Sequence, residues 1–347
     1  MEFLLLGIFA AGLLACVFSG ISVLYAMAFG FLLFFGYGLK RGKSAKEMAF
    51  FALSGVKTVK NILITFVLIG VITAVWRACG AIACIVYYAS ALCMPSVMLL
   101  ASFLMCCLVS FLTGTSFGSA ATIGVICMTM SRSMGIPEFY AGGAILAGVY
   151  FGDRCSPVST SALLVSEVTG TNLYSNIKKM MRTATVPFAV TCAAYAVLGM
   201  SFGGTGASAG TREILAENFS LSPLTLLPVA AVIILAICRV NVKITLAVSS
   251  LCGVLAAACV QKTALTALPE LIWNGFSPES GELARLMQGG GILSIVQVFC
   301  IVCVSSSYSG MFNGTGFLNS AGRLVSRLGE KVTPFGSVLI TLSLIHI

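Results

Sequence analysis

Only one aspartate occurs in the 347-residue chain, and it lies where apolar sequence turns polar. Asp153 follows the apolar run 140–151 and precedes the apolar residues 162–165. A charge in the middle of a membrane helix costs about 2.5–3.5 kcal/mol on insertion scales, so it persists where it faces a polar cavity, pairs or binds an ion. Carboxylate, hydroxyl and carbonyl oxygens suit a hard cation such as Na+. Because one carboxylate can hold either a proton or a cation, we expect Asp153 to be a site where H+ and Na+ compete.

Hydroxyl side chains surround this carboxylate in two polar stretches, residues 112–122 and 150–161. The residues that we predict as oxygen ligands or hinges are Ser156, Ser159, Thr160, Thr115 and Ser116. Glycine lets a helix unwind and proline breaks it, which predicts broken helices at Gly114, Gly118, Gly152 and Pro157. Freed carbonyls at such breaks can coordinate a cation. The alternative for Gly114 and Gly118 is a purely structural role, in a Gly-x-x-x-Gly contact between packed helices.

Two arginines interrupt the apolar pattern and are candidate charge partners. Arg154 follows Asp153 directly, but adjacent residues do not face each other on a helix, so a simple structural pair is awkward. Arg77 lies near the end of the apolar run that starts at residue 61. Its long side chain could reach a membrane interface, or it could pair with Asp153 or with an anionic substrate.

Composition places the chain in a membrane. Hydrophobic residues make up 59% of it and charged residues 9%, against roughly 25% charged residues in soluble domains. A single histidine, His346, excludes a His-rich metal site or a Ser-His-Asp triad in the body of the chain. The formal charge of +9 comes from short clusters between apolar runs, so we expect no nucleic-acid partner. We expect no cofactor, and no metal beyond transported Na+.

The apolar runs predict an all-α polytopic membrane protein with about 9–11 transmembrane helices, some of them broken or re-entrant. The candidates lie near residues 3–18, 21–38, 61–83, 95–113, 117–133, 137–152, 184–204, 223–238, 244–260, 290–307 and 335–345. Short loops rich in Lys and Arg stay in the cytoplasm. This rule puts residues 39–60 and 178–182 inside and the more acidic loop 261–289 outside. We therefore expect a multi-pass protein of a bacterial cytoplasmic (inner) membrane, surrounded by lipid.

A weak internal repeat relates the two parts of the chain. Residues 39–60 and 261–289 are each polar and each precede an apolar helix with a glycine-containing break, near Gly80 and Gly314. One copy starts from a basic, cytoplasmic stretch and the other from an acidic, external one, as in inverted-topology repeats of secondary transporters. We predict a first part, residues 1–204, with the first repeat, and a second part, residues 205–347, with an incomplete second repeat. The chain is expected to be truncated at its C-terminal end.

Residues 113–119, 122–125, 134–137, 141–145, 150–157 and 169–174 resemble the NhaC-type Na+/H+ antiporter family of the ion transporter superfamily. The resemblance runs from about Lys46 to Thr191 and continues more weakly over 260–340. It implies two inverted repeats whose broken helices meet at a midplane site, exchange of Na+ for H+, and frequent homodimers; some relatives couple exchange to malate or lactate. Phe117 and Arg154 replace a Trp and a Lys of the family pattern, and Thr160 stands where the family commonly has a second Asp.

These observations predict a secondary active transporter that exchanges Na+ for H+ by alternating access. The first alternative is a Na+- or H+-coupled carrier of an organic anion or amino acid, with Arg77 or Arg154 holding the carboxylate. The second alternative, a membrane-embedded enzyme, would need a nucleophile, base or metal cluster at membrane depth. The lone Asp153 and the terminal His346 argue against it.

Overall fold

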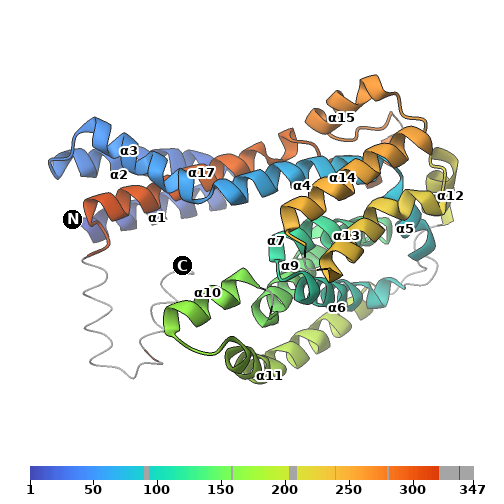
Figure 1. The fold of residues 1–347 in the computed structure, drawn as a ribbon, viewed down its shortest axis with the longest axis horizontal. Helices are drawn as coiled ribbons and strands as arrows, with labels where there is room; N and C mark the ends of the chain where they lie inside the picture. The colour runs from blue at the N-terminus through green and yellow to red at the C-terminus, as the bar shows by residue number, and fades with distance from the viewer. Residues whose placement is uncertain are drawn as a thin grey trace. The chain divides into compact units, whose positions relative to one another are not determined.

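The computed structural model describes residues 1–89, 94–157, 159–202, 209–238, 240–279 and 281–319, with residue 336. Within these ranges the chain is helical, and its one β feature is an isolated bridge between Phe276 and Gly289. The α-helices of Figure 1 are α1 Glu2–Phe18, α2 Val23–Lys40, α3 Ala45–Thr58, α4 Lys60–Ala78, α5 Ala81–Ala89, α6 Pro95–Thr113, α7 Ser116–Ser119, α8 Val125–Ser133, α9 Glu138–Cys155, α10 Thr160–Thr169, α11 Leu173–Met200, α12 Ala209–Asn218, α13 Leu227–Ile237, α14 Val242–Cys259, α15 Leu268–Asn274, α16 Gly281–Met287 and α17 Val296–Thr315. A π-helical turn, Ala120–Gly124, joins α7 to α8, and 3₁₀ turns cover Pro223–Leu226, Leu265–Ala267 and Leu293–Ile295.

Six described helices are long and apolar enough to cross a membrane, and a seventh span is possible if one bent pair counts as a single crossing. The pair is Gly210–Asn218 with Pro223–Ile237, bent by 94°. The sequence prediction of 9–11 spans also counted α1, which has 17 residues, the broken helix 116–133 and α9. It counted residues 335–345 as well, which lie outside the described residues apart from residue 336. The predicted all-α polytopic fold is confirmed.

The chain divides into two compact units, which are described separately. The first unit holds residues 1–63 together with the described residues from 296 onwards, and the second unit holds residues 64–295. This division follows contacts in space, whereas the predicted parts 1–204 and 205–347 follow the proposed repeat. The repeat boundary therefore stays a prediction.

In the first unit, α17 packs on α2 and α3, and α1 packs on α2. Phe34, Tyr308 and Phe317 are buried in an aromatic cluster, where rings of α2 and α17 meet edge to face. Gly55 and Gly310 let α3 and α17 approach closely, since a Cβ on either would strike the backbone of the other helix. Small residues at a helix contact are typical of membrane proteins, because close backbone approach strengthens van der Waals packing there.

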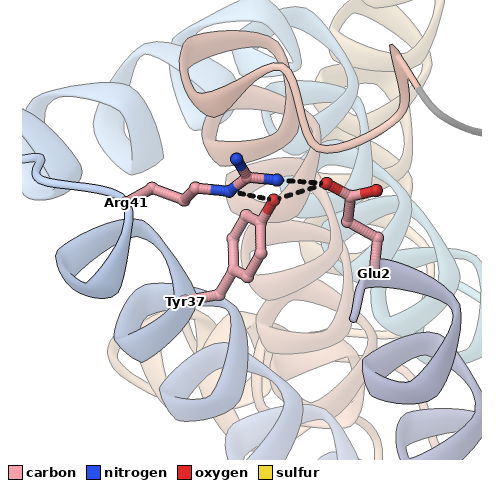
Figure 2. A network of polar contacts seen from close by, with 3 residues as sticks. All are labelled: Glu2, Tyr37 and Arg41. Carbon is pink, nitrogen blue, oxygen red and sulfur yellow. Dashed lines mark hydrogen bonds and ion pairs between the residues drawn. The ribbon is translucent and has the colours of Figure 1, made fainter.

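A polar network joins the start of α1 to the end of α2, as Figure 2 shows. Arg41 donates to Glu2 Oε1 at 2.6 Å and to the Tyr37 hydroxyl at 2.8 Å, and that hydroxyl donates to the same carboxylate oxygen at 2.8 Å. Hydrogen bonds to charged groups are stronger than neutral ones. The network holds the first residue of α1 beside the basic segment that the loop charges assign to the cytoplasm, so α1 and α2 form an antiparallel hairpin.

In the second unit, α6 and α9 run parallel and pack closely, and α8, which lies between them in the sequence, contacts both. Gly148 lies against Phe103 and Cys106, and Gly152 lies one turn further along both helices, against Cys107 and Ser110. An added Cβ at Gly148 or Gly152 would come within 2.5 Å of an α6 carbonyl oxygen. Two glycines four residues apart therefore set the distance between α6 and α9, and with it the positions of the two helix ends described below.

Candidate functional site

The break between α9 and α10 follows from proline chemistry. Pro157 disfavours helical backbone at the residue before it, and Ser156 is accordingly extended, with φ −80° and ψ 134°. Helix α9 therefore ends at Cys155. The next helix begins at Thr160, and the Ser159 hydroxyl caps it by accepting a hydrogen bond from the Ala162 amide at 3.3 Å.

Asp153 takes part in a short chain of oxygen atoms within this break. Ser159 Oγ donates to Asp153 Oδ1 at 2.6 Å and lies 2.7 Å from Ser161 Oγ. A serine hydroxyl has one hydrogen. When Ser159 gives that hydrogen to the carboxylate, Ser161 must donate to Ser159. The order Ser161 to Ser159 to Asp153 is thus fixed while Asp153 is ionised, and it places three oxygens next to one another.

The break after α6 is built differently. Gly114 adopts a left-handed conformation, φ 66°, which ends the helix and which residues with a Cβ rarely adopt. Thr115 is extended, and its hydroxyl caps the four-residue helix α7 by accepting from the Gly118 amide at 3.4 Å. The π-helical turn 120–124 follows at once. Such turns are rare and occur frequently at functional sites.

The two breaks meet because α6 and α9 are parallel and in register. Ser156 Oγ donates to the Phe111 carbonyl at 2.7 Å, and Ser110 Oγ donates at 2.5 Å to the carbonyl of Val149, seven residues before Ser156. Phe111 lies three residues before Gly114. A single region of the second unit therefore collects the end of α6, the end of α9 and the Asp153 carboxylate.

The predicted oxygen ligands occupy different places in this region. Ser159 contacts Asp153 directly, and Ser156 contacts a carbonyl at the end of α6. Thr115 and Ser116 lie at the start of α7, which packs against α9. Thr160 begins α10, but its side chain lies outside the described residues. Ser161 is not among the predicted ligands, although its position two residues after Ser159, at the start of a helix, brings the two hydroxyls together.

The predicted hinge residues also differ from one another. Gly114 and Pro157 lie in the two breaks. Gly118 lies inside α7, and Gly152 lies inside the continuous helix α9 against α6. The geometry of Gly152 is that of a packing contact, and a hinge role for any of the four stays a prediction.

Neither candidate arginine forms an ion pair with Asp153 within the described residues. Arg154 is exposed. Arg77 is only 8% exposed and lies inside the second unit, so its side chain is buried in protein and does not extend to an interface. In the described part of the chain no three His, Cys, Asp or Glu side chains gather to hold a metal ion. Within the described residues, the hydrogen-bond contact of the Asp153 carboxylate is the Ser159 hydroxyl.

Comparison with known proteins gives related sequences over most of the chain. A profile of the Na+/H+ antiporter family matches residues 148–347. The chain is 26% identical over 345 residues to the malate-2H+/Na+-lactate antiporter of Bacillus subtilis (strain 168), covering 97% of this chain and 73% of that protein. It is 29% identical over 314 residues to the Na+/H+ antiporter NhaC of Alkalihalophilus pseudofirmus, covering 88% and 66%. It is 28% identical over 355 residues to the arginine/ornithine antiporter ArcD of Halobacterium salinarum, covering 98% and 70%.

Proposed function

The chain belongs to the Na+/H+ antiporter family, and from this membership we propose that it exchanges Na+ for H+ by alternating access, with Asp153 as the group that both ions use. Its family and its membrane-length helices make it a multi-pass protein of the bacterial cytoplasmic membrane. The family match begins at residue 148, so the Asp153 break lies inside it.

The observation that carries the proposal is the contact between Asp153 and Ser159 at the paired helix breaks. An ionised carboxylate with neighbouring hydroxyl oxygens is a suitable environment for Na+. A protonated carboxyl becomes a hydrogen-bond donor, so it can donate a hydrogen bond to Ser159 Oγ while it keeps its proton, and it no longer attracts a cation. The two states exclude each other at one group, which is the requirement for exchange.

The test is transport by the chain reconstituted in liposomes that carry an internal pH indicator. An imposed Na+ gradient should drive proton movement in the wild type, and Asp153→Asn should abolish it, because an amide cannot release a proton. The matched control is Glu217→Gln, which removes an exposed carboxylate from α12 in the same unit. Proton movement that persists in Asp153→Asn at the rate of the control would refute the assignment.

A second candidate function is a Na+- or H+-coupled carrier of an organic anion or amino acid. The names of two relatives and the buried Arg77 favour it. The same liposomes separate the two functions: a pure Na+/H+ exchanger works with no organic solute present. A coupled carrier needs malate, lactate or an amino acid on one side before Na+ moves protons.

We also propose that the chain forms a homodimer, as the resemblance to its family implies. Native mass spectrometry of the purified protein in detergent tests this directly. A mass of two chains is expected, and a single-chain mass over a tenfold range of protein concentration would contradict it.

A further inference from the structure

A groove of about 660 Å³ opens in the first unit between α2, α3 and α17, which lie side by side in Figure 1. Small-molecule pockets usually measure about 300–1,000 Å³. Three of the lining residues, Ala28, Ala49 and Ala52, are alanines, whose short side chains leave the space between the helices unfilled. Among the described residues of the wall, Ser307 carries the one hydroxyl, and it donates to the Val304 carbonyl at 2.6 Å. This wall therefore suits a hydrocarbon group rather than a polar solute.

Helix α3 forms one wall of the groove and accompanies a membrane-length helix. A Cβ on Gly55 would strike Ser306 of α17. A Cβ on Gly314, further along α17, would strike Phe51, one turn earlier on α3. The two helices therefore run antiparallel and side by side. Because the segment Leu293–Thr315 is long and apolar enough to cross a membrane, the groove beside it lies at the depth of the bilayer hydrocarbon.

Positive charge marks one end of the groove. Lys46, Ala49, Leu53 and Val56 follow one another at intervals of three or four residues, so they share one face of α3. Three of them, from Ala49 onwards, line the groove. Lys46 therefore lies one turn before the first α3 residue of the wall. This end belongs to the basic segment that the loop charges assign to the cytoplasm.

The ammonium group of Lys46 is available to an outside partner. Glu2 pairs with Arg41, and the Glu47 carboxylate accepts from the Ser44 amide at 2.7 Å. Lys46 is exposed and forms no ion pair within the described residues. Anionic lipids of the cytoplasmic leaflet attract Lys and Arg side chains near the membrane surface. A lipid phosphate is therefore the anion that this end of the groove would meet in a membrane.

We propose that the groove binds an anionic phospholipid of the cytoplasmic leaflet, with one acyl chain between α2, α3 and α17 and the phosphate at Lys46. Lys40 and Lys43 add positive charge at the same end. Wall atoms that face an empty space lose dispersion contacts, and a hydrocarbon chain supplies them. The proposal goes beyond ion exchange at Asp153, because the groove and Asp153 belong to different units.

Native mass spectrometry of the purified chain in detergent tests the headgroup. The protein is incubated with phosphatidylglycerol and, separately, with phosphatidylethanolamine of the same acyl chains. Phosphatidylglycerol should be retained in preference. Lys46→Gln should lower its retention about fivefold, the equivalent of about 1 kcal/mol for one lysine near an anionic surface, and leave phosphatidylethanolamine unchanged. Lys46→Arg should keep the preference. The matched control is Lys179→Gln, which removes an exposed lysine from α11.

Photocross-linking tests the groove itself. Phosphatidylglycerol with a diazirine on one acyl chain is irradiated with the protein in liposomes, and the labelled peptides are identified by mass spectrometry. We expect labels within residues 49–56 and 303–307. Ala49→Phe fills the groove and should reduce labelling of both segments, and Ala28→Phe is the test variant if Ala49→Phe fails to fold. Ala10→Phe adds the same ring to an exposed position of α1 that does not line the groove, so its labelling should match the wild type.

Equal retention of the two lipids, or a preference that Lys46→Gln leaves unchanged, would overturn the role of Lys46. Labels elsewhere, or labels that Ala49→Phe does not reduce, would overturn the groove as the site. A second copy of the chain in the groove would give a dimer mass that Ala49→Phe abolishes, with no lipid retained, and would also overturn the proposal. Asp153→Asn should retain lipid like the wild type, so failure of the lipid site and failure of the exchange mechanism give different results.

Discussion

Adding one methyl group to Gly152 should separate the two helix breaks. The new Cβ of Gly152→Ala would lie 2.5 Å from the Cys107 carbonyl oxygen and 2.6 Å from the Phe111 amide nitrogen. These are backbone atoms, which cannot rotate away. Because unbonded atoms of this size rest about 3.5 Å apart, α6 must recede by about 1 Å.

The displacement has a local and a functional consequence. Overpacking of this kind costs about 1–3 kcal/mol. A shift of about 1 Å would also stretch the 2.7 Å hydrogen bond from Ser156 to the Phe111 carbonyl beyond bonding distance. The loss of that bond adds about 0.5–1.5 kcal/mol. Gly152→Ala should therefore lower both the apparent melting temperature and the rate of Na+-driven proton movement.

The matched control lies on the same helix. A Cβ at Gly142 would meet only the Met128 methyl group, at 3.7 Å, which is ordinary van der Waals contact. Gly142→Ala should be neutral or stabilising, by up to about 1 kcal/mol, because alanine favours helix more than glycine does. Fluorescence-monitored unfolding in detergent and the liposome assay measure both variants. Equal behaviour of Gly152→Ala and Gly142→Ala would refute the close approach of α6 and α9.

Three further variants test the helix starts. Ser159→Ala removes the cap of α10 and the contact with Asp153, so the apparent melting temperature should fall, since a lost cap costs about 0.5–2 kcal/mol, and the Na+ concentration for half-maximal exchange should rise. Ser161→Ala should lower the melting temperature less. A larger loss of stability in Ser161→Ala than in Ser159→Ala would contradict the capping role. At the start of α3, a hydrogen bond from the Ser44 amide lowers the pKa of Glu47 below its ordinary value of 4.5. A lowered folded-state pKa stabilises the protein above the ordinary value and loses that effect as the pH falls through the folded pKa. The difference in melting temperature between wild type and Glu47→Gln should therefore be constant near neutral pH and shrink as the pH falls below the ordinary value of 4.5. A difference that grows on acidification would contradict this.

The helices and their breaks could be predicted because their signals are local. Each apolar run from residue 3 to 307 overlaps one or more helices, and Gly114 and Pro157 break the chain for reasons that depend on one or two residues. The meeting of the two breaks was not predicted. It depends on Gly148 and Gly152 facing α6, and the sequence pattern was interpreted as small-residue packing only at Gly114 and Gly118.

The burial of Arg77 could not be predicted for a related reason. Helix α4 is apolar on all sides, so its sequence does not distinguish the face that contacts lipid from the face that contacts protein. Gly289, whose backbone lies next to the guanidinium, is more than 200 residues further along the chain. Contacts over such a separation depend on tertiary packing, so they cannot be predicted from the local sequence pattern of α4.

One oxygen atom, Ser159 Oγ, serves two structures at once. It completes the first turn of α10 by accepting from the Ala162 amide, and it also contacts Asp153. A hydroxyl oxygen has two lone pairs, and while Ser159 donates to Asp153 the Ala162 amide and the Ser161 hydroxyl occupy both of them. If Na+ binds Ser159 Oγ as proposed, it must therefore displace either the cap of α10 or the hydrogen bond from Ser161. Occupancy of the proposed site and order at the start of α10 would then be coupled through a single atom.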